Sequence, residues 1–343
     1  MEGSFSNNTE LDDFFDFEDK ADATNITSNV NYCHKTTEVI FWILNSLIGA
    51  IILLGNSFTC VVFLSSKRLR QSYMNVFLIS LACLDLLMAI GVVPFYAVYC
   101  SRGCRYPLGK YCWLFRATKD CVLLASTLNI CAIAYDRYLA VIHPLHYGAK
   151  MTNRRVTAIL GGVWLLPVVV AAIRSTWHHT KSGENLRFAN KLYDIVLTFL
   201  FVLLSIIVSL FVNTKVMIAV KTHKERERNR RHLGRANDEE LTRLRIRKGT
   251  RACIFVVFVY IACWLPRIVY NLSYVIKPPG LANPLFLKIA FFFLYLQSSA
   301  NPFIYSFYRS EFRVAALRLI RWRSRRRIDP VLELHSTNFL STT

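Results

Sequence analysis

The sequence predicts an all-α membrane protein, a seven-transmembrane-helix bundle with a short amphipathic eighth helix. A helix needs roughly 20 consecutive apolar residues to cross a bilayer, and 54% of the 343 residues are hydrophobic. No run alternates apolar with polar residues as a barrel strand would, and only a helix pairs all its backbone polar groups within one span. The seven sufficiently long runs lie near 38–65, 73–98, 109–141, 153–175, 190–220, 246–276 and 283–308.

The net charge of +20 could indicate a nucleic-acid partner, but the placement of the charges favours a membrane topology instead. Lysine and arginine are concentrated in the first, third and fifth loops and in the tail, whereas the N-terminal segment is acidic. The positive-inside rule places the basic segments in the cytoplasm. Glycosylation sequons at Asn7 and Asn25 agree with an extracellular N-terminus. We expect a multi-pass protein of the plasma membrane, in contact with membrane lipids and with no nucleic-acid partner.

This topology divides the chain into four segments. Residues 1–37 form an acidic, glycosylated extracellular tail without the apolar core of a cleavable signal, and residues 38–308 form the bundle. Over 309–323, apolar residues recur at helical spacing among arginines, which predicts an amphipathic helix on the inner leaflet. Residues 324–343 form a cytoplasmic tail. Between the fourth and fifth helices we expect a polar loop over 176–189.

Six short motifs occur in order along the predicted helices. They are Gly55-Asn56, Leu81-Ala82-Cys83-Leu84-Asp85, Asp136-Arg137-Tyr138, Trp164, Cys263-Trp264-Leu265-Pro266 and Asn301-Pro302-Phe303-Ile304-Tyr305. Together they resemble the rhodopsin-like (class A) G-protein-coupled receptors over nearly the whole membrane portion. The resemblance implies a receptor, not an enzyme, that transmits binding of an extracellular ligand to heterotrimeric G proteins. It also implies arrestin and receptor kinases as further partners, acting on serine and threonine residues of the tail.

The resemblance implies a sodium ion and no other cofactor. Asp85 lies near mid-membrane, where an ionised carboxylate is costly and persists only with partners; a protonated core aspartate is the alternative. The resemblance implies that Asp85, Ser126, Ser298 and Asn301 hold the ion below Trp264. Oxygen ligands suit such a hard cation.

The same resemblance assigns signal transmission to residues near the cytoplasmic end. Asp136 would neutralise Arg137 in the resting state, and the arginine would turn toward the G protein when the sixth helix moves. Pro266 and Pro302 each remove a helical hydrogen bond and could act as hinges. The rest of the expected coupling set is Tyr138, Leu145 and Tyr305.

Some features depart from the family pattern. The fifth helix has no proline between Tyr193 and Val220, where most relatives carry one. At the base of the sixth helix, the charges of residues 243–248 are all basic, where relatives often carry an acid that pins the arginine of the third helix. Our hypothesis is a weakly latched resting state with appreciable basal signalling.

The cysteines also depart from the pattern. Cys112 matches the family's disulfide position at the top of the third helix, but residues 174–192 contain no cysteine. Cys33, Cys100, Cys104 and Cys112 allow three pairings, and the sequence does not choose among them. A second extracellular loop without cysteine and a fifth helix without proline resemble the branch that contains melanocortin, cannabinoid, lysophospholipid and adenosine receptors.

Two ligand classes of the family are disfavoured. In amine receptors an aspartate eighteen residues before the arginine of Asp-Arg-Tyr pairs with the ligand's ammonium, and Lys119 occupies that position. Asp120 is rotated by about 100° from it and should aim elsewhere. Tyr295 replaces the retinal lysine of opsins. We therefore expect neither a simple amine nor retinal.

The outer half of the predicted bundle is rich in basic residues, which would attract an anionic ligand. They are Arg116, Lys119, Arg174, Arg187, Lys191, Arg267 and Lys288. The alternative is that these charges reach lipid head groups or pair with Asp120, Asp194 and the acidic tail. We expect a peptide, or an anionic small molecule or lipid, as the ligand. The predicted pocket residues are Arg116, Lys119, Trp264, Arg267, Lys288 and Tyr295.

Other functions fit less well. A transporter or channel usually shows inverted repeats and broken spans, and the sequence shows no internal repeat. An enzyme would need a nucleophile–base pair or a metal triad, and the sequence offers none. Within receptors, the alternative is a constitutively active orphan regulated by its own N-terminal tail. Deleting residues 1–30 would then raise signalling.

Overall fold

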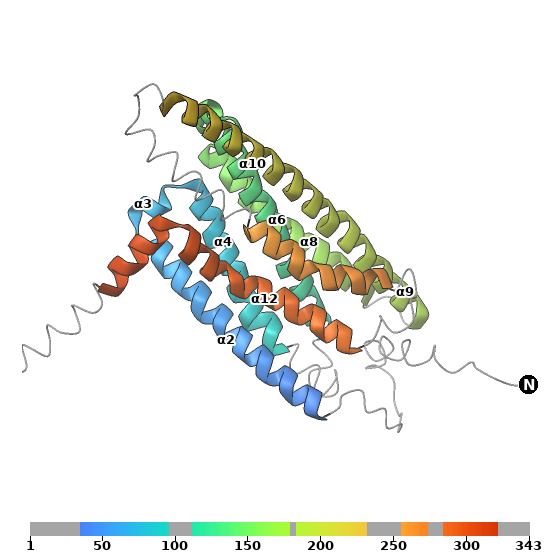
Figure 1. Ribbon diagram of the computed structural model, residues 1–343. Helices are drawn as coiled ribbons and strands as arrows, with labels where there is room; N and C mark the ends of the chain where they lie inside the picture. The colour runs from blue at the N-terminus through green and yellow to red at the C-terminus, as the bar shows by residue number, and fades with distance from the viewer. Residues whose placement is uncertain (1–34, 96–111, 179–182, 232–254, 274–283, 322–343) are drawn as a thin grey trace, which may run out of the picture.

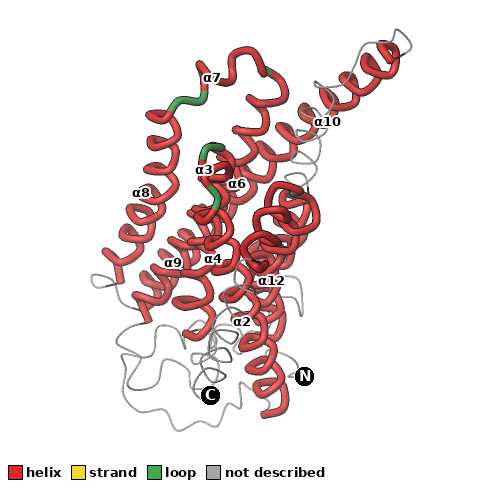
Figure 2. The backbone as a smooth tube through the Cα atoms, turned by 90° about the vertical axis from the view of Figure 1, so that its left-hand side faces the viewer, coloured by secondary structure: helices red, strands yellow, loops and turns green. Residues whose placement is uncertain are grey.

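The described part of the chain is helical throughout. The computed structural model describes residues 35–95, 112–178, 183–231, 255–273 and 284–321, and it has no strand among them (Figures 1 and 2). The long helices are α2 (Lys35–Ser65), α4 (Tyr73–Leu87), α6 (Cys112–Ile142), α8 (Asn153–His178), α9 (Gly183–Leu197), α10 (Leu204–Arg231), Phe255–Ser273 and α12 (Pro284–Tyr308). The short ones are α3 (Lys67–Arg70), the 3-10 turn η4 (Pro144–His146), α7 (Tyr147–Lys150) and a last helix over 310–321. The predicted all-α class is confirmed.

The predicted loop over 176–189 is wrong for most of its length. α8 continues to His178, and α9 already begins at Gly183. Apolar residues recur in this stretch at helical spacing, at Leu186, Ala189 and Tyr193, which is the pattern of an amphipathic helix. Its many polar and charged residues are also typical of a loop, which is why a loop was predicted. The fifth helix of the bundle is therefore longer than predicted.

Two helices contain a π-helical segment that the sequence analysis did not predict. η2 (Met88–Val92) continues α4, and η5 (Thr198–Leu203) joins α9 to α10. A π-turn accommodates one extra residue and occurs frequently at functional sites. The fifth helix lacks the proline that most relatives carry, and the π-helical segment η5 interrupts its regular α-helical geometry instead.

The polarity of the bundle is that of a membrane protein. Six described helices are long and apolar enough to cross a membrane. α12 is not among them, because it carries Lys288, Gln297 and Asn301, all of which are buried. Leu54 is 71% exposed on the outside, whereas Asp85 is 0% exposed in the interior. A lipid-facing apolar exterior with polar groups turned inward is what a bilayer requires.

α6 occupies the centre of the bundle, where it packs against α4, α8 and α10 (Figure 1). α2 packs against α4 and α12. Glycine at position 55 permits this approach, since a Cβ atom there would lie 2.9 Å from Cγ of Pro302. Next to it, Asn56 Nδ2 donates a hydrogen bond of 3.2 Å to the carbonyl of Ser298. These contacts hold α12, and the polar residues on it, against α2.

Candidate functional site

A cavity lies among α6, the fifth helix, helix Phe255–Ser273 and α12. It contains about 490 Å³ of empty space, including its open mouth. The described residues that line it are Lys119, Asp120, Leu123, Leu124, Thr127, Asp194, Leu197, Thr198, Phe201, Val202, Trp264, Arg267, Asn271 and Phe291.

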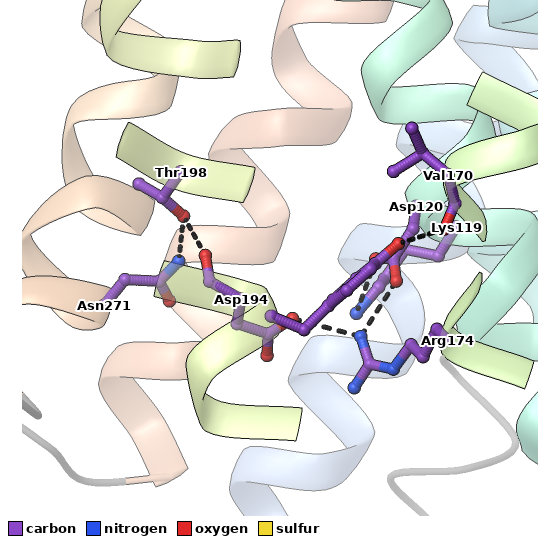
Figure 3. Close-up of polar contacts among 8 residues, drawn as sticks. Lys119, Asp120, Val170, Arg174, Asp194, Thr198 and Asn271 are labelled. Atoms are coloured by element: carbon purple, nitrogen blue, oxygen red, sulfur yellow. Dashed lines mark hydrogen bonds and ion pairs between the residues drawn. The ribbon is translucent and has the colours of Figure 1, made fainter. Parts of the chain in front are cut away.

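Charged side chains on one wall of the cavity form a continuous network (Figure 3). Arg174 of α8 donates hydrogen bonds to Asp120 Oδ2 at 2.8 Å and to Asp194 Oδ1 at 3.0 Å. Lys119 Nζ lies 3.5 Å from Asp120 Oδ1. The network ties α8 to α6 and α9, and it neutralises carboxylates that would otherwise be costly to bury.

A second group of charges surrounds one aromatic ring. Lys119 Nζ lies 5.6 Å from the ring centroid of Phe291, and the guanidinium carbon of Arg267 lies 5.0 Å from the same centroid. Lys119 and Arg267 therefore converge on Phe291 from α6 and from helix Phe255–Ser273. Among the described residues, no carboxylate lies within 4.0 Å of Arg267. Counting Arg174, the three cations around the cavity exceed the two carboxylates, Asp120 and Asp194, by one charge.

The structure brings together only some of the residues predicted to form the pocket. Lys119, Trp264 and Arg267 line the cavity. Arg116, Lys288 and Tyr295 are buried but are not among its lining residues. Lys288 turns instead toward α2, where its Nζ lies 6.0 Å from the ring centroid of Phe41.

Polar residues of the fifth and sixth helices complete the cavity, and the sequence analysis did not single them out as its lining. Thr198 Oγ1 donates to the carbonyl of Asp194 at 2.7 Å and accepts from Asn271 Nδ2 at 2.5 Å. Thr198 begins η5, so the π-segment contains the link between these two helices. The sequence did offer a signal, because Thr198 and Asn271 are polar residues within apolar runs. A π-turn, however, changes the face of the helix on which the residues beside it lie.

Deeper in the bundle, Asp85 lies among polar groups that fit a cation. Asn301 Nδ2 donates to Asp85 Oδ2 at 2.7 Å, and Ser298 lies beside the same carboxylate. Among the described residues, Asp85 Oδ1 and Ser126 Oγ have no hydrogen-bond partner although both are buried. Buried polar atoms are rarely left unsatisfied. These oxygens therefore fit the predicted sodium site.

The opposite end of α6 carries a second charged cluster. Arg137 donates through Nε to Asp136 Oδ2 at 2.9 Å, and Tyr147 Oη donates to Asp136 Oδ1 at 2.7 Å. Burial and, to a lesser extent, the negative charge of Asp136 raise the pKa of the Tyr147 phenol. Tyr138 stacks edge-on against His143.

Leu145 is 94% exposed beside this cluster, which is unusual for a leucine so close to a bundle. Pro302 lies inside α12 and Pro266 inside helix Phe255–Ser273. The side chains of Tyr305 and Cys112 lie outside what the structure describes, as do Cys33, Cys100, Cys104, Asn7, Asn25 and the basic segment 243–248.

The fold and these sites define a multi-pass helical membrane protein with a charged cavity and an arginine–carboxylate cluster at two ends of one central helix. Lys119 and Arg137 are separated by about 27 Å along α6, at 1.5 Å per residue. The chain belongs to the rhodopsin family of seven-transmembrane receptors, whose family model matches residues 55–305. This is a family of receptors, not of enzymes.

Several known receptors are similar to the chain. A D(5)-like dopamine receptor of Takifugu rubripes is 27% identical over 77% of this chain and 63% of its own length. A D(1C) dopamine receptor of Xenopus laevis is 29% identical over 80% of this chain and 66% of its own length. A histamine H2 receptor of Canis lupus familiaris is 27% identical over 85% of this chain and 81% of its own length. The chain thus spans less than two thirds of the length of these dopamine receptors.

All three relatives are named for amines. The expected peptide or lipid ligand, and the resemblance to the melanocortin and cannabinoid branch, gain no support from them. The departure from amine receptors at Lys119 remains a feature of this chain.

Proposed function

We propose that the protein is a plasma-membrane receptor that couples a small extracellular ligand with an anionic group to heterotrimeric G proteins. The observation that carries the proposal is the convergence of Lys119 and Arg267 on Phe291 inside the cavity. A carboxylate or phosphate between these two cations would form charge-assisted hydrogen bonds, which are about twice as strong as neutral ones. The aromatic ring would pack against an apolar part of the ligand.

The size of the cavity narrows the expected ligand. Only about 50 Å³ of the cavity admits the centre of a water-sized molecule, which suits a small ligand better than a peptide or a whole lipid. Trp264 lines the cavity, so a bound ligand would contact it directly. We infer that its displacement is relayed along α6 and the neighbouring helices to Asp136, Arg137 and Leu145, where the G protein would bind on the cytoplasmic side.

A second candidate is an amine ligand, favoured by the names of the relatives. Its ammonium would bind Asp194, whose side chain is 25% exposed, whereas that of Asp120 is 8% exposed. Against this candidate, Arg174 already occupies Asp194 Oδ1 at 3.0 Å. An ammonium would have to share the carboxylate with a buried guanidinium.

Further parts of the proposal rest on family membership. Asp85, Ser126, Ser298 and Asn301 would hold a sodium ion, which would supply positive charge to the buried carboxylate. Arrestin and receptor kinases would act on the cytoplasmic side, with the N-terminus extracellular. Regulation by the N-terminal tail remains an alternative to an external ligand, and higher basal signalling after deletion of residues 1–30 would favour it.

The experiment is a G-protein activation assay in cells with two matched panels, one of small carboxylates and phosphate esters and one of monoamines. We expect an anion to activate the wild type, and Lys119→Gln and Arg267→Gln each to lower its potency at least tenfold, the cost of one hydrogen bond to a charged group. Lys215→Gln, an exposed cation of α10 away from the cavity, is the matched control. Activation by an amine that Asp194→Asn abolishes and Lys119→Gln preserves would replace the first candidate with the second.

A further inference from the structure

A groove lies between α3 and the helix over 310–321, far from the cavity described above. It holds about 1440 Å³ of space including its open mouth. Figure 1 shows the two helices at the same end of the bundle, next to the end of α2. Its lining residues are Val62, Ser65, Ser66, Lys67, Arg68, Leu69, Ser310, Glu311, Val314, Ala315, Arg318 and Leu319.

The polar side of the groove is positively charged. Among the described lining residues, Lys67, Arg68 and Arg318 are basic and Glu311 is acidic, so they carry two more positive than negative charges. Arg68 Nη2 lies 4.0 Å from Glu311 Oε1, and the side chains are 69% and 36% exposed. Such an exposed, loose pair contributes little and leaves the arginine available to another anion.

The other side of the groove is apolar and continues onto the lipid-facing surface. Val62 and Leu69 form its buried floor, and Val314 is 48% exposed at its rim. Leu64 and Leu317 extend this exposed apolar surface along α2 and the last helix. A molecule with a negative head and an apolar body matches both sides.

The groove is preformed because the last helix is firmly anchored. The ring of Phe312 lies 5.3 Å from that of Phe63 and is 1% exposed. Arg309 donates to Asn75 Oδ1 at 2.5 Å. Arg313 donates to the carbonyl of Phe307 at 2.5 Å. A ligand would therefore not have to order this helix on binding.

We propose that this groove binds an anionic phospholipid whose headgroup carries more than one phosphate. On the topology proposed above, the groove faces the cytoplasmic leaflet, where anionic lipids attract basic segments by about 1 kcal/mol per lysine or arginine. A lipid headgroup with two or more negative charges balances the two excess positive charges of the groove. A headgroup with one negative charge leaves one of these positive charges without a partner. The inference does not depend on which extracellular ligand is bound.

The test measures binding of a fluorescent short-chain phosphatidylinositol bisphosphate to the full-length receptor in phosphatidylcholine nanodiscs. Arg68→Gln with Arg318→Gln should weaken binding roughly 25-fold, about fivefold per arginine. The control, Arg70→Gln with Arg321→Gln, removes the same charge from the same two helices outside the groove and should change affinity less than twofold. Equal losses in both pairs would show general surface attraction and overturn the proposal.

Two further measurements identify the class of ligand and provide a test if the double variant does not fold. Excess soluble inositol bisphosphate or phosphatidylserine should compete poorly; equal competition would assign the groove to a free polyphosphate or to any anionic lipid. If the double variant does not fold, Glu311→Gln alone decides. Removing Glu311, the only acid among the described residues that line the groove, should strengthen binding about fivefold, and an unchanged or weaker affinity contradicts the proposal.

Discussion

The phenolic hydroxyl of Tyr147 donates a hydrogen bond of 2.7 Å to Oδ1 of Asp136, the carboxylate whose Oδ2 accepts from Arg137. One oxygen of Asp136 thus accepts a hydrogen bond from the first residue of α7, and the other accepts one from the neighbouring Arg137. Tyr147 holds Asp136 in the orientation that neutralises Arg137.

Replacing Tyr147 by phenylalanine should raise ligand-independent G-protein activation severalfold. The hydrogen bond to a charged group is worth about 1.5–3 kcal/mol, and without it the carboxylate holds Arg137 less firmly. The raised pKa of Tyr147 keeps the phenol protonated below its unperturbed pKa of about 10, and the bond is lost only as pH rises through the higher folded value. The ratio of basal activity between Tyr147→Phe and wild type, measured on purified receptor, should therefore be the same at pH 6 and at pH 9. Unchanged basal activity in the variant would contradict this role.

Arg174 should be essential for the stability of the bundle. Removing one partner of a buried ion pair costs about 3–5 kcal/mol, because the remaining charge is left uncompensated. Arg174→Gln would leave both Asp120 and Asp194 without their guanidinium. We expect a fall of about 10 °C in the melting temperature of the detergent-solubilised protein, from about 2–4 °C per kcal/mol. Adding Asp120→Asn should recover part of the loss, and no recovery would mean that packing, not charge, dominates.

Sodium should stabilise the wild type through Asp85. At about five times its dissociation constant, a ligand that binds only the folded state contributes about 1 kcal/mol, or roughly 2 °C in melting temperature. Unfolding in NaCl is compared with unfolding in KCl at equal ionic strength. Asp85→Asn should abolish the difference. A difference that persists in the variant would place the ion elsewhere.

Phe312 should anchor the last helix to α2. Replacing a buried phenylalanine by alanine costs about 3–5 kcal/mol in a packed core, and here the loss should appear locally as faster amide hydrogen exchange over 310–321. Phe307→Ala is the control, because that side chain is 73% exposed. Equal exchange in the two variants would mean that Arg309 and Arg313 suffice to hold the helix.

The helices could be predicted from the sequence because apolar runs of bilayer length have few other solutions. Asp85, Asp136 and Arg137 could be singled out because charge inside a bundle requires partners; in the structure Asp85 is buried and Asp136 pairs with Arg137. The cavity was predicted less well. Lys288 and Arg116 are buried as well, but helix rotation and side-chain direction decide which buried basic residues reach the cavity. Asp194 and Asn271 depend on a π-turn that no local pattern indicated.

The π-turn at Thr198–Leu203 has a consequence for comparing this chain with its relatives. One inserted residue rotates everything beyond it by about 100°. Suppose that a relative lacks this π-turn and that its fifth helix is aligned with this one from the cytoplasmic end. The alignment then pairs Asp194, and every residue before it, with residues that lie on a different face of the relative's helix. Two receptors can present equivalent side chains to a ligand from positions that a gapless alignment sets one residue apart.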